Sequence, residues 1–566
     1  MKTRLLATFL TIITANYAGF VDAGAPLSCN VENQFTTIRG WMQDAFSVPA
    51  NPESKEFDVF VGVILRHHGV VLGHGSGRSL EESARIAFQK LRRQNLFKRN
   101  EQISSTKEMI DAISIEIEVC NKLLASPNKY IDRFAYNFDY GNNGIAVRRG
   151  DQLDFRLPCE LRLAPHKDAV AITESLCINV GMPPTIAFSH KIPIDANATL
   201  YTLPCHTFLQ NGVHGKITPL IRGDELITLA PIDIGHLTSI ADSLASHLIA
   251  STRGGSVIGG YQPELDMFTN MFATHFVQVL TAEALYKYGH VEGVLNANEA
   301  NTAATAIAES IAIDVQTSQN IDFETASLLV VMYLQSNLEQ SEEVQKLLFV
   351  CEQKVLDKAN SIVRAEMIDT PAFVLALLCS ATYEIERKNK EEKFELSSSL
   401  CAFCWKATTI QDRASLIPWI IDPMIALEQM QRGSFATPLS EFQSLARESQ
   451  VHKNGVDKGG FQLQTRSRSV VDARGLRMLP MLSKLCNKRM ENSTESFITL
   501  VHSLRFLEQL ITSEERAMRF ENPAMALGGV RTSTWDASMP TEATAMALLG
   551  VVDSIHVVNN ILSFAE

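Results

Sequence analysis

Gly459-Gly460-Phe461-Gln462 and Gly528-Gly529-Val530-Arg531 are the stretches that decide the fold of the second half of the chain. Each lies in a break just before a helical stretch, as do Gly254-Gly255 and Gly259-Gly260. Glycine tolerates a positive φ and allows its backbone to approach a neighbouring segment closely. We therefore expect these pairs to punctuate a series of helices. Four unrelated flexible loops are the alternative.

Helical periodicity dominates the chain from about Asp233 onward. Met267–Tyr288 carries a broad apolar face at 3.6-residue spacing. Similar faces recur in seven further stretches, namely Thr325–Gln335, Val344–Val363, Pro371–Ile385, Ile417–Met430, Leu476–Cys486, Phe497–Ile511 and Ala543–Phe564. Helices too small to bury their own apolar faces must stack as a repeat or close into a ring. At about two helices per 50–60 residues, residues 230–566 are expected to form an (α/α)5-6 toroid of paired helices.

The first part of the chain has a mixed pattern, which predicts an α+β domain over residues 30–229. Phe57–Leu65 alternates and is β-branched, His67-His68-Gly69 is typical of a turn, and Val70–Leu72 returns as a second strand. Leu80–Leu91 is predicted to be a helix with Ser79 as its N-cap. Further elements are expected at Lys107–Ile113 (helix), Ile113–Cys120, Gly144–Arg148 and Phe155–Pro158 (strands) and Asp168–Val180 (helix).

The first 23 residues have the pattern of a secretory signal peptide. Met1–Arg4 is basic, Leu5–Ala15 is apolar, and Val21-Asp22-Ala23 provides a cleavage site after Ala23. An N-terminal helix that stays attached is the alternative. We expect an exported protein, in the periplasm, the extracellular space or the cell envelope, and export would allow some of the ten cysteines to be oxidised.

Composition excludes several classes of protein. Hydrophobic residues make up 46% of the 566 residues and charged residues 20%, the balance of an ordinary globular protein. A formal net charge of −12 disfavours nucleic acid as a partner, because phosphate binding needs a basic face. The internal apolar stretches, such as Thr544–Val552, are shorter than a membrane span requires. No transmembrane segment is expected after signal cleavage.

Residues from about 57 to 205 resemble the AMMECR domain family. The resemblance is carried by Val59–Leu65, Gly69–Gly75, Ile113–Val119, Gly144–Gly150 and Leu176–Pro183. The family's Leu-Arg-Gly-Cys-Ile-Gly signature corresponds to Leu72-Gly73-His74-Gly75 here, with His74 in place of the cysteine. The resemblance implies an AMMECR-like α+β fold and no settled activity.

The helical half resembles the terpene-cyclase and protein-prenyltransferase type of toroid. Gly459–Gln462 with Asp472 is similar to the stretch that supplies an Asp and a Cys to the prenyltransferase zinc, and Gly528–Arg531 to the stretch that precedes the zinc His. Arg474 stands at the Cys position, and Glu542 or Ala543 at the His position. A cation beside Asp472 would form an ion pair with it. We therefore predict no zinc and no other cofactor.

The sequence also lacks the carboxylate cluster that a cyclase needs. Protonating an alkene needs crowded carboxylates that raise one another's pKa, and the sequence has no Asp-x-Asp-Asp cluster. We expect that the chain is not an enzyme of either type, and that it is a ligand-binding or interaction protein whose partner is a small molecule or another protein.

The alternative is an enzyme that acts in the toroid cavity, in particular a carboxylate-dependent enzyme acting on saccharides. Cleavage of a glycosidic bond needs two carboxylates about 5–10 Å apart, and the candidates are Asp472, Glu542 and Asp536. Arg474, Arg531, Trp535 and His275 are the candidate ligand contacts. His275 would line the cavity; a satisfied core histidine is the other interpretation.

Overall fold

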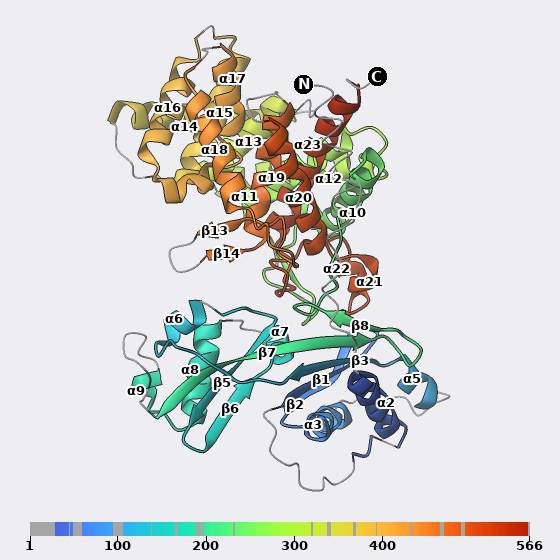
Figure 1. Ribbon diagram of the computed structural model, residues 1–566. Coiled ribbons are helices and arrows are strands. Elements are labelled where there is room, and N and C mark those ends of the chain that lie inside the picture. The colour runs from blue at the N-terminus through green and yellow to red at the C-terminus, as the bar shows by residue number, and fades with distance from the viewer. Residues whose placement is uncertain are drawn as a thin grey trace.

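The computed structural model describes residues 29–563, apart from positions 45, 49–58, 94–105, 137, 165–167, 188–193, 195–196, 230–231, 319–320, 337–340, 366–369, 392, 431–432, 465–468 and 488–492. The predicted signal peptide lies outside the described residues. An N-terminal sheet region is followed by a C-terminal helical ring, and the sheet region covers one end of the ring (Figure 1).

The sheet region is built on one antiparallel sheet in the order β2-β1-β3-β7-β5-β6, with β4 and β8 also pairing with β7. Its strands are β1 (Phe60–His67), β2 (Val70–Gly77), β3 (Ser114–Cys120), β4 (Leu124–Ala125), β5 (Asn143–Arg149), β6 (Gln152–Arg156), β7 (Ala198–Gln210) and β8 (Ile217–Leu220). Its helices are α2 (Cys29–Gln43), α3 (Leu80–Arg93), α5 (Thr106–Ala112), α6 (Ile131–Tyr136), α7 (Pro158–Leu163), α8 (Ala169–Asn179) and α9 (Pro184–Ala187).

The predicted hairpin and the helix after it are confirmed. His68 and Gly69 form the turn with φ of 45° and 80°, and β1 pairs with β2 in antiparallel register. The Ser79 hydroxyl accepts a hydrogen bond from the Glu82 backbone N–H at 3.1 Å, as an N-cap does. The predicted segments at 107–113, 113–120, 144–148, 155–158 and 168–180 match α5, β3, β5, β6 and α8 to within a few residues.

The central strand β7 is absent from the sequence prediction. It has 13 residues and pairs with β3 on one side and β5 on the other. Pro204 cannot donate to a ladder, and Thr202, Thr207 and His206 interrupt the alternation of apolar residues. The strand forms because its neighbours supply partners along its whole length, which no local pattern reveals.

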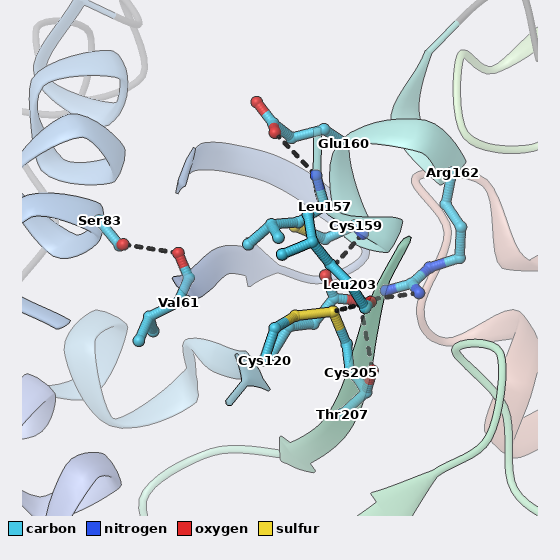
Figure 2. The surroundings of a disulfide bond; sticks show 11 residues. Val61, Ser83, Cys120, Leu157, Cys159, Glu160, Arg162, Leu203, Cys205 and Thr207 are labelled. Carbon is cyan, nitrogen blue, oxygen red and sulfur yellow. Dashed lines mark hydrogen bonds and ion pairs between the residues drawn. A yellow bond between two sulfur atoms is a disulfide. The ribbon is translucent and has the colours of Figure 1, made fainter. Parts of the chain in front are cut away.

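A disulfide joins β3 to β7 at directly opposed positions. Cys120 and Cys205 are register partners with Cα atoms 4.3 Å apart. Figure 2 shows Cys159, Arg162 and Thr207 gathered beside this bond. The disulfide closes a loop of 85 residues, so it limits the freedom of the unfolded chain considerably.

The helical ring is closed. Six inner helices pack in succession within the described part of the chain, and the last packs against the first. They are α11 (His275–Gly289), α13 (Phe323–Gln335), α15 (Ala372–Lys388), α17 (Ile421–Met430), α19 (Met478–Asn487) and α23 (Thr541–Ser563). Each packs against an outer helix, respectively α12 (Ala297–Ser318), α14 (Glu342–Ala365), α16 (Glu395–Ala407), α18 (Ala436–Ser449), α20 (Ser493–Leu510) and α10 (Ile234–Ala250). The pairing of outer with inner helices is that of an α/α toroid.

Short elements decorate the end of the ring that faces the sheet region. They are the pairs β9 (Thr252–Arg253) with β10 (Ser256–Val257), β11 (Tyr261–Gln262) with β12 (Met267–Phe268), and β13 (Gln462–Gln464) with β14 (Ser469–Val471), together with η1 (Ile410–Leu416), η2 (Ala473–Arg477), α21 (Glu514–Ala517) and α22 (Pro523–Ala526). β13, β14, α21 and α22 lie between the ring and the sheet (Figure 1).

The prediction of one helix over Met267–Tyr288 is wrong. β12 and a loop take up its first part, and α11 begins only at His275 with Thr274 as its N-cap. Met271 and Phe272 are exposed. These apolar residues happen to fall at helical spacing, which led to the prediction of a helix. The segment forms part of a hairpin instead, because Phe268 in β12 pairs with Tyr261 in β11.

The helix α23 is apolar because it is a wall of the ring. Thr541–Ile561 is long and apolar enough to cross a membrane by length and composition, but 78% of its most apolar window is buried inside the protein. It packs against α10, α11 and α19. A buried core helix accounts for its hydropathy.

Two of the glycine pairs show why glycine is needed before the helices. Gly459 has φ of +88°, and a Cβ there would lie 1.9 Å from the carbonyl oxygen of His502. Gly528 has φ of +75°, and its Cβ would lie 2.1 Å from the carbonyl oxygen of Ser243. Both positions combine a left-handed backbone with a contact to an outer helix, so they fix how the loops seat on the ring.

We predict that Gly459→Ala destabilises the protein more than Gly254→Ala. Gly254 also has a positive φ, +59°, but nothing lies within 4 Å of its Cβ position. Gly254→Ala should lower the free energy of unfolding by only the ~1–2 kcal/mol that a left-handed backbone costs an alanine. Gly459→Ala should lower it by about 1–3 kcal/mol more, because its Cβ also clashes with the carbonyl oxygen of His502. Urea unfolding followed by circular dichroism measures both. Equal losses would show that the loop at 459 moves away without cost.

Candidate functional site

The centre of the ring is nearly filled. The space there measures 20 Å³ and is lined from all six inner helices, by residues that include Glu283, Lys287, Asp422, Lys484 and Asp553. Lys287 binds Glu283 at 2.8 Å, and burial raises the pKa of Asp553. Such a volume holds about one water molecule, so this particular space has no room for a sugar ring.

The larger space lies where the sheet region meets the ring. This cavity, which we call the basic cavity, has a volume of 360 Å³ and takes its walls from β1, β3, the end of β7, the linker after β8, α21 and the segment before α23. Its size falls in the range of ~300–1,000 Å³ that ligand sites occupy. Because both parts of the protein line it, it exists only when they are docked.

Arginine dominates the walls of the basic cavity. Six guanidinium groups line it against four carboxylates: Arg66, Arg162, Arg222, Arg516, Arg519 and Arg531, with Glu116, Asp224, Glu264 and Glu515. The overall charge of the chain is −12, so this concentration of cations is a local feature. Each of these arginines is also paired with at least one carboxylate, so cations and anions are interleaved around the space.

Asp224 organises three of these arginines. Its side chain is 2% exposed and accepts Nε of Arg516 at 2.9 Å and a guanidinium NH2 of Arg531, while Arg519 lies 3.7 Å away. Arg531 also donates to the carbonyl oxygens of Gln509 and Leu510. Burial, opposed by Asp224, lowers the pKa of Arg516 to about 10. One carboxylate from the linker thus pairs with two buried cations of the ring, Arg516 and Arg531, and lies near a third that is partly exposed, Arg519.

Arg222 and Arg66 join the sheet region to the ring. Arg222 donates to Asp139 of the sheet region at 2.8 Å and to Asp457 of the ring at 2.6 Å. Arg66, at the end of β1, pairs with Glu264 at 3.1 Å and donates to the carbonyl oxygen of Arg519 at 3.1 Å. These contacts hold both walls of the basic cavity in place.

A stacked aromatic pair closes another side. The rings of Tyr140 and Trp535 lie 4.4 Å apart at an interplanar angle of 16°. Tyr140 belongs to the sheet region and Trp535 to the segment before α23, and Trp535 also lines the basic cavity. The cavity therefore has an aromatic surface beside its arginines.

The sheet contributes a buried ion-pair network. Arg162 on α7 pairs with Glu116 and with Glu118, the latter at 2.9 Å. Glu118 also accepts the backbone N–H of Cys159 at 2.7 Å and the hydroxyl of Thr207 at 3.2 Å (Figure 2). Burial raises the pKa of Glu118 and, strongly, that of the Cys159 thiol. Glu116 and Arg162 are the members of this network that reach the basic cavity.

The protein does not use all the donors of these arginines. A guanidinium has five N–H groups. Arg519 donates one to the carbonyl oxygen of Gly223 at 3.3 Å and one to Glu225 at 2.8 Å. Within the described residues, Nε of Arg519 and Nε of Arg222 are buried without a hydrogen-bond partner. Both nitrogens are shielded from solvent, so a ligand in the cavity would meet the other N–H groups of these guanidinium groups.

A second cavity adjoins the first. This side cavity has a volume of 160 Å³ and is lined by Arg162, Leu163, Ala164, Gln262, Pro263, Glu264, Leu265, Asp536 and Ser538. Arg162 and Glu264 line both cavities. It therefore lies at the same junction.

Of the candidate site residues predicted from the sequence, some line the two cavities and others do not. Arg531 and Trp535 line the basic cavity, and Asp536 lines the side cavity. Asp472 is buried and forms an ion pair with Arg474, whose NH2 lies 2.6 Å from Oδ2. This is the pair expected from a cation at the cysteine position of the zinc stretch.

The remaining candidates lie apart from both cavities. Glu542 is exposed in the first turn of α23, and Arg474 is exposed beside Asp472. His275 is not in the ring interior: it begins α11 at the end of the ring and lies 3.8 Å from Asp314. Of the three candidate catalytic carboxylates, Asp536 is the one that borders a described cavity.

Sequence reasoning missed most of the basic cavity. Asp224, Arg516 and Arg519 carried no motif, although the spacing of Arg516 and Arg519 places both on one face of a helical turn. Arg66 and Arg222 lie in the sheet region and its linker, far in sequence from the ring residues that they meet. A local pattern cannot reveal residues that function only across a docked interface.

Comparison with known proteins gives distant structural similarities. The GH76A α-1,6-mannanase from Salegentibacter sp. HEL1_6 is 10% identical, with a TM-score of 0.43 over 57% of this chain and 100% of that one. A possible GH105 family member from Klebsiella pneumoniae is 10% identical, with a TM-score of 0.37 over 60% of this chain and 96% of that one.

The uncharacterised protein PH0010 from Pyrococcus horikoshii is 15% identical, with a TM-score of 0.22 over 33% of this chain and 93% of that one. No protein-family model matches the sequence, and no curated protein matches it.

We predict that Asp224→Asn strongly destabilises the docked protein. It removes the charge that compensates the buried guanidinium groups of Arg516 and Arg531, and breaking a buried ion pair in this way costs about 3–5 kcal/mol. The matched control is Glu342→Gln, which removes a pair with Lys346 whose side chains are 75% and 66% exposed, and should cost less than about 1 kcal/mol. Thermal unfolding compares the two. Similar unfolding temperatures would contradict a structural role for Asp224.

Proposed function

We propose that this protein is a binding protein that takes a small anionic ligand into the basic cavity at the junction of its two parts. The observation that carries the proposal is the ring of six arginines around a 360 Å³ space. Guanidinium groups bind carboxylate, phosphate and sulfate oxygens through paired N–H donors. The space described at the ring centre has a volume of only 20 Å³, so the basic cavity is the larger of these two spaces.

We propose further that the protein works outside the cytoplasm. The signal-like N-terminus supports export, and so does the disulfide between Cys120 and Cys205, since disulfides persist in oxidising compartments. The likeness of the sheet region to the AMMECR domain, and of the ring to the cyclase and prenyltransferase toroids, stay predictions from sequence.

Anion binding is tested with citrate and inorganic phosphate as probes, measured by isothermal titration calorimetry at low salt with neutral glucose as the reference. We expect both anions to bind and glucose to bind weakly or not at all. Salt should weaken the binding of the anions, because a partly exposed ion pair is screened within about 10 Å at 0.1 M.

Arg519→Gln should weaken citrate binding by about ten-fold or more, the loss of one charge-assisted contact. Arg387→Gln is the matched control, since Arg387 lies on α15, is 49% exposed and pairs with Glu384. Arg519→Lys should recover part of the affinity. Absence of citrate and phosphate binding in the folded wild-type protein would overturn the proposal.

The second candidate is the carboxylate-dependent enzyme acting on saccharides. One observation favours it: Asp536 and Glu264 both line the side cavity. Glu264 is paired with Arg66 at 3.1 Å, and Asp536 accepts the hydroxyl of Ser538 at 2.8 Å. Each is thus engaged by a neighbour in the structure.

Release of reducing ends from a panel of neutral and acidic oligosaccharides tests this candidate. Activity that Asp536→Asn abolishes, and that the exposed control Asp314→Asn leaves intact, would establish it in place of simple binding. Asp314 suits the comparison because its carboxylate is 56% exposed on α12. On the binding proposal we expect no turnover above the background of the protein-free reaction.

A further inference from the structure

We infer that the ligand is an acidic saccharide, with its acid group in the basic cavity and its hydroxyl groups in the side cavity. The inference rests on the proposed function, because it needs the basic cavity to bind an anion. It adds the class of ligand and a second group of contact residues.

The two cavities are neighbours, since Arg162 and Glu264 line both of them. The segment before α23 runs along the border of the two cavities, and its successive residues line one cavity and then the other. Trp535 and Ala537 line the basic cavity, whereas Asp536 and Ser538 line the side cavity. A ligand longer than a single acid group would extend from one into the other past this segment.

The side cavity has the mixed chemistry that suits sugar hydroxyls. Gln262 offers an amide donor and acceptor, Ser538 a hydroxyl, and Asp536 a carboxylate acceptor. A sugar hydroxyl both donates and accepts, so it can satisfy each of these groups. Apolar side chains complete the wall, namely Leu163, Ala164, Pro263 and Leu265, and they match the C–H faces of a sugar ring.

The aromatic wall of the basic cavity also favours a saccharide ligand. Trp535 is held by its stacking on Tyr140, so its ring orientation is fixed before a ligand arrives. A pyranose presents a flat set of C–H bonds that packs well on an indole surface, and pockets commonly combine such an apolar surface with a few polar groups. A bare inorganic anion would use only the arginines.

The arginines account for the acid group. Arg66 pairs with Glu264, Arg162 lines both cavities together with Glu264, and Arg519 lines the basic cavity. Carboxylate and sulfate on a sugar would both meet guanidinium donors there. The ligand is therefore a saccharide that carries an anionic oxygen group. The probes below distinguish a carboxylate from a sulfate as that group.

The test uses the full-length protein and calorimetry with D-glucuronate, a digalacturonate, D-glucose 6-sulfate, inorganic phosphate and D-glucose. We expect at least one acidic sugar to bind about ten-fold more tightly than phosphate, through hydrogen bonds that phosphate cannot make. Preference for glucuronate and digalacturonate would identify a carboxylated sugar, and preference for the sulfate ester a sulfated one.

Gln262→Ala and Asp536→Asn separate the two cavities. Each of these two substitutions should weaken binding of the acidic sugar about five-fold or more and leave phosphate binding unchanged. Arg519→Gln should instead weaken the binding of the acidic sugar and of phosphate alike. Asp536 accepts the backbone N–H of Ser538 at 3.1 Å, so its substitution risks the local turn. Gln262→Ala keeps the test independent of that turn, and Asp314→Asn is the exposed control.

The outcomes distinguish the two proposals. If phosphate and citrate bind through Arg519 but no acidic sugar binds more tightly, this inference is wrong and the proposed function stands. If the acidic sugars bind and Gln262→Ala and Asp536→Asn change nothing, the side cavity takes no part and the inference is again wrong. If no anion binds, both proposals fall.

Discussion

The single carboxylate of Asp224 is the interaction on which the junction depends. It is contributed by the linker between the sheet region and the ring, and it is buried among Arg516, Arg519 and Arg531. A buried guanidinium without a counter-charge is unfavourable, so the ring arginines need the linker in this position. Once the linker is fixed, the sheet region must lie over the same end of the ring, as Figure 1 shows.

The other cross-junction contacts build on that constraint. Arg222 extends from the linker to Asp139 on one side and Asp457 on the other, and Arg66 reaches Glu264. Individually such pairs contribute modestly when they are partly exposed. Together they place six arginines around a space that neither part could enclose alone. The basic cavity is therefore a product of docking, and any loss of docking removes it.

The ring serves this arrangement as a scaffold. Charged pairs line the space described at its centre. Lys287 pairs with Glu283 on the same helix, α11, whereas Lys484 on α19 pairs with Asp422 on α17, and this space has room for about one water molecule. The basic cavity lies instead at the end of the ring where the glycine loops contact the outer helices. Gly459 and Gly528 approach carbonyl oxygens of α20 and α10 there, so the loops that carry Asp457, Arg531 and Trp535 are held rigidly.

The sequence by itself determined the local elements: the hairpin at His67–Gly69, the Ser79 cap and most of the helices, because each depends on neighbours within a few residues. It also anticipated the ion pair of Asp472 with Arg474, which are two positions apart. Only the tertiary structure decided that β7 is the central strand, that Met267–Phe272 is not helical, and that Arg531 meets Asp224 across 307 positions of sequence. The physical reason is range: periodicity and capping act over one or two turns, whereas strand pairing and buried charge compensation are set by whichever distant segments the closed ring and the docked sheet bring together.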